Sequence, residues 1–220
     1  RKLIPYGSPP SADLLNAVDR RIQELVLEPA SLAPMARFMG VGDIVVRSDL
    51  TYERYNTPRP RLLWAQVVGA PGLGDPIGFG GNARNVPRAD LPLEDEQELL
   101  TPPDLEDPPQ VGIVPVDDAE QIVRTAGTDQ PIVLAGDGEG LVDLAAAGLV
   151  TGHEVVLYSG TVTPTGDQLD TALDDGAALV LTDTNRRRAL RWGTVRDNTG
   201  ITERAGQEAL RVDPKDQRLE

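Results

Sequence analysis

Two short stretches of the chain place polar residues directly after an apolar run, where the strand of a parallel sheet would end. They are AGDGEG at 135–140 and TDTN at 182–185. A glycine-rich turn that opens a helix presents backbone N–H groups suited to a phosphate. An Asp-x-Asn pair supplies the oxygen ligands that a hard divalent cation prefers. The sequence therefore raises two chemistries, binding of a nucleotide or sugar phosphate and binding of a metal ion.

The glycine-rich stretch departs from the common phosphate-binding patterns. Its glycines, Gly136, Gly138 and Gly140, follow G-x-G-x-G rather than G-x-G-x-x-G spacing, and no lysine follows them as in a P-loop. Asp137 and Glu139 lie between the glycines and would repel a phosphate. We therefore predict a tight turn between a strand and a helix, with no cofactor bound there.

The TDTN stretch leads into a cluster of arginines. Asp183 and Asn185 would be the cation ligands, but three arginines follow at 186–188 and disfavour a bound cation. Asp183 is predicted instead to cap the following turn or to pair with an arginine. No metal site is predicted in this stretch.

The residues after the apolar run at 178–181 also form a candidate sugar-binding lip. Aromatic rings stack on the apolar faces of sugars, and charged side chains bind sugar hydroxyls. The candidate glycan-binding residues are Asp183, Asn185, Arg188, Arg191 and Trp192, together with Tyr52 and Tyr55. The alternative is that each aromatic ring is a core anchor. No residue is predicted to be catalytic.

The composition of the 220 residues disfavours several classes of protein. The net charge is −14 and the pI is about 4.5, whereas nucleic acids and anionic membranes attract basic surfaces. The chain has no cysteine and one histidine, His153, which disfavours a structural zinc site or a Ser-His-Asp triad. No apolar run approaches the roughly 20 residues of a membrane span. Because the first residue is not Met, we expect a piece of a longer chain.

The N-terminal part, residues 1–109, combines helices, a strand and a long connection. Apolar residues at helical spacing predict an amphipathic helix over 11–27, with Ser11 as its N-cap. A shorter helix and a strand are predicted to follow, over 32–39 and 43–48. Glycine, proline and acidic residues dominate 72–109, which predicts a loop-rich connection and a domain boundary.

The second part, residues 110–198, alternates strands and helices. Strands are predicted over 111–116, 131–135, 154–158 and 178–182, and helices over 139–150 and 166–176. A parallel return needs a crossover of about a dozen residues, so this spacing predicts βαβ units around a parallel sheet. The expected fold class is therefore α/β, with a polar linker tail over 199–220.

Four strings of the sequence together resemble one protein family. They are MGVGDIVVRSDLTYERYNTPRPR, PGLGDPIGFG, PIVLAGDGEGLVDLAAAGLV and ALVLTDTNRRRALRWGTVRDNTGITERAG, which follow one another along most of the chain. They resemble the soluble extracytoplasmic part of the large actinobacterial, mycobacterial-type α-(1→3)-arabinofuranosyltransferases of the GT-C class, which build cell-wall arabinan.

The resemblance implies a division of labour within one large multi-pass membrane protein. Its membrane-embedded part carries the catalytic acidic residue and uses a polyprenyl-phosphate arabinose donor, and carbohydrate-binding modules follow. The present chain would be a non-catalytic module without a cofactor at the periplasmic face. There it would brace the active-site face and contact the arabinan glycan of arabinogalactan or lipoarabinomannan.

Two alternatives stay open at this point. One is a free-standing α/β enzyme that binds a nucleotide or sugar phosphate at 135–140 or 182–185, where open α/β sheets place their ligands. The other is a purely structural spacer. No nucleic acid partner is expected for any of the three.

Overall fold

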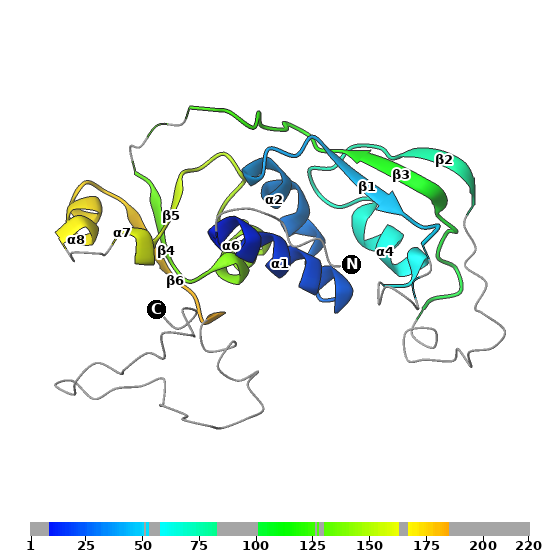
Figure 1. Cartoon of the computed structure of the whole chain (residues 1–220), viewed down its shortest axis with the longest axis horizontal. Helices are drawn as coiled ribbons and strands as arrows, with labels where there is room; N and C mark the ends of the chain where they lie inside the picture. The colour runs from blue at the N-terminus through cyan, green and yellow to red at the C-terminus, as the bar shows by residue number, and fades with distance from the viewer. Residues whose placement is uncertain are drawn as a thin grey trace, which may run out of the picture. The chain divides into compact units, whose positions relative to one another are not determined.

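The computed structural model describes residues 9–50, 52, 58–82, 101–125, 127, 130–162 and 167–184. They belong to two compact units, whose elements are labelled in Figure 1. Unit 1 comprises Arg1–Ala126 and Val142–Glu154, and unit 2 comprises Gly127–Leu141 and Val155–Glu220. The described part of each unit contains helices and a three-stranded sheet, which confirms the predicted α/β class.

The helices of unit 1 lie mostly in its N-terminal part. They are α1 (Pro9–Gln23), the 3₁₀ turn η1 (Pro29–Ser31), α2 (Leu32–Phe38) and α4 (Pro60–Val67). The helices predicted over 11–27 and 32–39 are confirmed. However, α1 begins at Pro9, so the prediction that Ser11 is its N-cap is wrong. Proline suits the first turn of a helix, because its missing N–H would have no helical partner there.

The sheet of unit 1 is antiparallel. Its strands are, in spatial order, β1 (Asp43–Arg47), β3 (Pro109–Pro115) and β2 (Ile77–Asn82). The strands predicted over 43–48 and 111–116 are confirmed as strands. The prediction that 111–116 joins a parallel sheet is wrong, because β3 pairs antiparallel with both β1 and β2. The stretch predicted to be loop contains β2, an edge strand that pairs with β3 along one side despite its glycines.

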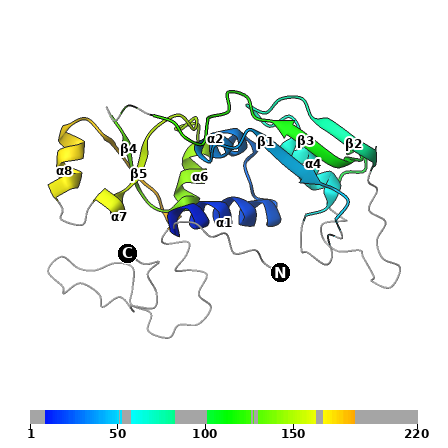
Figure 2. The same cartoon turned by 45° about the horizontal axis from the view of Figure 1, so that its top comes forward.

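One face of this sheet, the inner face, forms part of the core of unit 1. Val46 of β1 and Val114 of β3 are buried there. Trp64 of α4 lies against Gly112 of β3, so closely that a side chain at Gly112 would overlap the indole ring. Figures 1 and 2 both show α4 beside β1 and β3. Helix α4 therefore covers the inner face by inserting a large ring over a residue that has no side chain.

The sheet of unit 2 is parallel and confirms the predicted arrangement for the remaining three strands. Strand β4 (Ile132–Ala135) lies between β5 (Val156–Tyr158) and β6 (Ala178–Leu181). Val133 and Leu134 of β4 are fully buried, as expected for the central strand of a parallel sheet.

Three helices connect or follow these strands. Helix α6 (Gly138–Ala146) follows β4, while α7 (Ser159–Val162) and α8 (Asp167–Asp174) come between β5 and β6 in the chain. The helices predicted over 139–150 and 166–176 are confirmed with shorter bounds. The domain boundary after residue 109 stays a prediction, and the tail over 199–220 lies outside the described residues.

Candidate functional site

The turn between β4 and α6 is closed by its own aspartate. Asp137 Oδ1 accepts hydrogen bonds from the backbone N–H groups of Glu139 (3.0 Å) and Gly140 (3.2 Å) at the start of the helix. The side chains of Asp137 and Glu139 are buried. The predicted tight turn is confirmed, and a negative carboxylate already holds N–H groups that a phosphate would need.

Thr182, directly after β6, packs into this turn. Its N–H and its hydroxyl both donate to Ala135 O at 3.1 Å, and its Oγ1 lies 3.1 Å from Thr184 Oγ1. A Cβ on Gly140 would stand 2.7 Å from Thr182 Oγ1, and one on Gly136 would stand closer still. The two glycines are therefore explained by the packing of a threonine, without any ligand.

The described residues include Asp183 and Tyr52 from the candidate glycan-binding set. Asp183 is the second residue after β6 and is exposed. Tyr52 is only 6% exposed, and the guanidinium carbon of Arg59 lies 4.2 Å from its ring centroid. This burial favours the core-anchor alternative for Tyr52. The glycan-binding role stays a prediction for the remaining residues, which lie outside the described part of the chain: Tyr55, Asn185, Arg188, Arg191 and Trp192.

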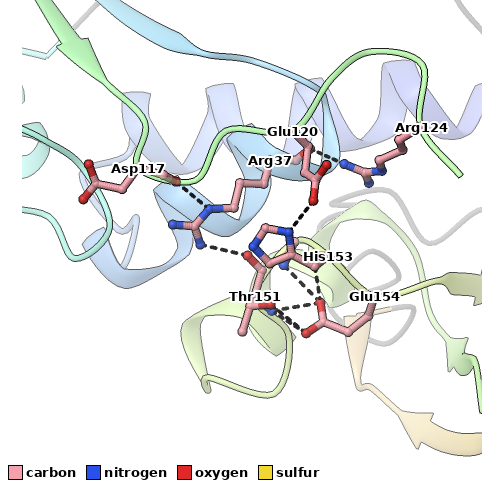
Figure 3. A network of polar contacts seen from close by, with 8 residues as sticks. Arg37, Asp117, Glu120, Arg124, Thr151, His153 and Glu154 are labelled. Atoms are coloured by element: carbon pink, nitrogen blue, oxygen red, sulfur yellow. Dashed lines mark hydrogen bonds and ion pairs between the residues drawn. The ribbon is translucent and has the colours of Figure 1, made fainter. Parts of the chain in front are cut away.

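Unit 1 contains a network of polar contacts that joins three segments of the chain (Figure 3). Arg37, near the end of α2, donates from Nε to Asp117 O (2.9 Å) and from Nη1 to Thr151 O (3.0 Å). Arg124 Nη1 donates in turn to Arg37 O (2.8 Å). One arginine thus links α2 to the segment after β3 and to the loop after α6.

The single histidine, His153, also links the loop after α6 to the segment after β3. His153 Nδ1 lies 2.5 Å from Glu120 Oε1, and the two side chains are 42% and 29% exposed (Figure 3). The hydrogen bond from His153 holds the pKa of the Glu120 carboxyl below its usual range. Loss of hydration raises this pKa, while electrostatic interactions with His153 and Arg124 lower it further.

Glu154 closes the loop after α6 with its side chain. Its carboxylate accepts hydrogen bonds from Thr151 N (3.0 Å), Thr151 Oγ1 (2.8 Å), Gly152 N (3.0 Å) and His153 N (3.2 Å). Partial burial raises the pKa of Glu154, but these hydrogen bonds outweigh it and leave the pKa below its usual range. The loop that supplies His153 and the Thr151 carbonyl is therefore fixed by an ionised carboxylate.

The contacts of this network indicate a structural role: they hold α2, the segment after β3 and the loop after α6 in place. A carboxylate on Nδ1 of an imidazole fixes its tautomer, which is also the supporting half of a catalytic triad. However, the nearby hydroxyl of Thr151 donates to Glu154, and the guanidinium of Arg37 contacts two backbone carbonyls. Among the residues that the structure describes, no group of three or more His, Cys, Asp or Glu could hold a metal ion.

Sequence reasoning singled out His153 but missed the polar network around it. Arg37 and Glu120 lie far from residues 151–154 in the chain, so no local spacing indicated their contacts. The available signal was the run Thr151 to Glu154, in which a glycine and a carboxylate within three residues are typical of a side-chain-closed turn.

The sequence was compared with protein families, curated proteins and solved structures. The model of a family described as alpha-(1->3)-arabinofuranosyltransferase, N-terminal GT-C domain, matches residues 1–215. The chain belongs to this arabinofuranosyltransferase family. No curated protein sequence matches it.

The chain is similar to two solved structures of the arabinofuranosyltransferase AftD from mycobacteria, of which the first matches the fold. The first, with a TM-score of 0.57 and 22% sequence identity, covers 82% of this chain. The second is a mutant form, with a TM-score of 0.49, 23% identity and 84% of this chain covered. This family member spans only 13% of the first solved chain and 14% of the second. In the described residues of this arabinofuranosyltransferase segment, no helix is long and apolar enough to cross a membrane.

Proposed function

We propose that this chain is a non-catalytic structural module of an arabinofuranosyltransferase that extends cell-wall arabinan. The module lies at the periplasmic face of a multi-pass membrane enzyme and braces the face that contains the active site. Family membership supports the enzyme class, and the small share of the solved arabinofuranosyltransferase that the chain spans supports a module rather than a whole enzyme.

The observation that carries the bracing role is the network around Arg37. The guanidinium groups of Arg37 and Arg124 contact backbone carbonyls, and through them the network joins α2, the segment after β3 and the loop after α6. The bond from Arg124 to Arg37 O is partly buried and the two bonds from the Arg37 guanidinium are exposed, and together they hold the three segments at a defined geometry. A module built in this way supplies a rigid surface to its neighbours.

The donor in this proposal is a polyprenyl-phosphate arabinose, which is the substrate of the membrane-embedded part. No cofactor is assigned to the present module. In the turn after β4, the Asp137 carboxylate already accepts hydrogen bonds from the N–H groups at the start of α6, which argues against a sugar-phosphate site there.

Contact with the arabinan acceptor is the finer part of the proposal. The arginines and Trp192 that follow β6 in the sequence would supply it, next to the exposed Asp183. Titration of arabinan oligosaccharides against the full-length enzyme tests this part. Trp192→Ala should weaken binding, because a lost ring removes stacking area, while Asn16→Ala on the surface of α1 should leave binding unchanged.

The bracing role is tested in the full-length enzyme by the temperature dependence of arabinose transfer. Arg37→Ala should leave transfer nearly intact in the cold and abolish it at a lower temperature than in the unsubstituted enzyme. The control is Gln23→Ala, which breaks an exposed hydrogen bond to Asp19, four residues away on α1. A loss of transfer at every temperature with an unchanged melting curve would show that Arg37 takes part in the reaction. Turnover by the present chain alone would equally contradict the proposal.

A further inference from the structure

The unit 1 sheet has a second face, the outer face, which carries Val45, Ile77, Phe79, Val111 and Ile113. We propose that this outer face docks the module onto another folded part of the same arabinofuranosyltransferase polypeptide. This inference rests on the proposed function, since it requires the chain to be one module of a larger enzyme.

The strand register places these side chains in two adjacent rows. Ile113 of β3 lies opposite Val45 of β1 on one side and opposite Ile77 of β2 on the other. Two residues away on β3, Val111 lies opposite Arg47 and Phe79. Cross-strand partners and residues two apart share a face, so the apolar side chains form one continuous patch.

The patch is exposed to a degree that is unusual for such side chains. Val45, Ile77 and Phe79 are 57%, 54% and 52% exposed. An antiparallel sheet with one solvated face normally carries polar residues on that face. Isolated exposed apolar residues need no explanation, whereas a contiguous patch marks an interaction surface.

The core of unit 1 does not need this face. Val46 and Val114 lie on the opposite side of the same strands and are buried, and Trp64 of α4 packs on Gly112 on that side. Figure 2 shows α4 beside the strands. The apolar residues of the outer face therefore stabilise something other than the sheet's own core.

The chemistry of the patch decides among its occupants. A glycan needs hydrogen-bonding groups beside an aromatic ring, and four of the five side chains are aliphatic. A second copy, or an anionic bilayer, would bring further negative charge to a chain that already carries −14. Arg47 at the rim is paired with Asp49 at 2.6 Å, so it adds no net attraction for anions.

The arguments against a glycan, a second copy and an anionic bilayer do not apply to another part of the same polypeptide. Most of the solved arabinofuranosyltransferase chain lies outside the matched region, so a large amount of tethered protein surface is available. Tethering raises the effective concentration of such a surface to about the millimolar range, at which a modest apolar patch is sufficient for docking. The occupant is therefore an apolar protein surface of low negative charge, supplied in cis.

The test is thiol labelling of the full-length enzyme. The present chain has no cysteine, so Val45→Cys and Phe79→Cys each introduce one thiol into the module, and the labelling of the unsubstituted enzyme is subtracted. Asn16→Cys on the exposed surface of α1 is the matched control. The face thiols should react with maleimide at least about tenfold more slowly than the control, because interface cores exclude water. Equal rates would overturn the docking surface.

A cross-linking arm identifies what covers the face. A maleimide-benzophenone linker on Phe79→Cys, applied to a mixture of isotopically light and heavy enzyme, should yield cross-linked peptides of a single isotope and from outside residues 1–220. Mixed-isotope products would indicate a second copy and would overturn the inference, as would cross-links to lipid alone. Neither arm requires arabinose transfer, so a failed docking surface and a failed bracing role give different results.

Discussion

Gly152 approaches Pro34 so closely that a Cβ on the glycine would stand 2.6 Å from the proline carbonyl oxygen and 2.6 Å from Arg37 Cβ. The backbone of Gly152 also has a φ of 99°, which residues with side chains rarely adopt. Both facts concern the loop that supplies Thr151 and His153 to the polar network, so the glycine is what allows this loop to lie against α2.

Gly152→Ala should therefore destabilise unit 1 strongly. A non-glycine residue in such a conformation costs about 1–3 kcal/mol, and the overlap with backbone atoms adds to it. The control is Gly160→Ala in α7, where a Cβ meets nothing within 4 Å and alanine favours the helix. Chemical denaturation of the purified chain measures both; equal stability of the two variants would contradict the assigned packing.

Asp137→Ala should weaken the start of α6. Losing an N-cap acceptor costs about 0.5–2 kcal/mol of stability. Asp137→Asn should keep most of the stabilisation, because the amide oxygen can accept the same hydrogen bonds. Asp174→Ala at the end of α8 is the control, where removing a carboxylate from a helix C-terminus should be neutral or slightly stabilising. Urea titrations followed by circular dichroism report the three midpoints. An Asn variant as unstable as the Ala variant would argue that charge, and not capping, is what Asp137 supplies.

The pH dependence of stability should carry a contribution from Glu154. Its pKa is lowered in the folded chain, so its stabilising effect is present above the ordinary glutamate pKa and is lost as the pH falls through the lowered value. Glu154→Gln should thus be less stable than the unsubstituted chain at pH 7, by about 1 kcal/mol for a partly solvated carboxylate. The two stability curves should converge as the pH falls below the ordinary glutamate pKa and through the lowered value. Curves that stay parallel down to the acid limit of folding would show that ionisation of Glu154 is not involved.

The ion pair between Arg21 of α1 and Asp143 of α6, at 2.6 Å, should show measurable coupling. Arg21 is buried, so a double-mutant cycle to alanine is expected to give a coupling energy of about 1–3 kcal/mol. The exposed pair of Arg47 and Asp49 has similar distances and serves as the control, with an expected coupling well below that of the buried pair because water screens it. The prediction fails if the two cycles give the same value.

The parallel half of the fold was predictable from sequence, and the antiparallel half was not. Strands β4, β5 and β6 are separated by helical or loop segments of crossover length, so local spacing dictated their pairing. Strand β3 carries apolar residues on both faces, as a buried parallel strand would, and its true neighbours begin at residues 43 and 77. Nothing in the local sequence of β3 distinguishes a parallel strand from an antiparallel one. The glycines of β2 also weaken the pattern that would have predicted β2 as a strand.

Part of the candidate site was also predictable from sequence, and part was not. The capped turn at Asp137 was predictable, because its residues are consecutive and their charges alone argue against a phosphate. The contact of His153 with Glu120 was not, since it joins residues 33 positions apart through exposed side chains. Polar contacts between exposed residues far apart in the chain leave no local pattern in the sequence, whereas caps and turns are marked by characteristic residues at fixed positions.

The fit of Thr182 between Gly136 and Gly140 also has a consequence for how this family can diverge. A methyl group on either glycine would overlap the threonine hydroxyl, and the hydroxyl holds the end of β6 to the end of β4. A lineage that acquires alanine at 136 or 140 must therefore acquire a smaller residue at 182 at nearly the same time. Substitutions at these three positions should therefore be correlated. The stability lost on replacing Gly136 or Gly140 alone should be restored by a second substitution, Thr182→Gly.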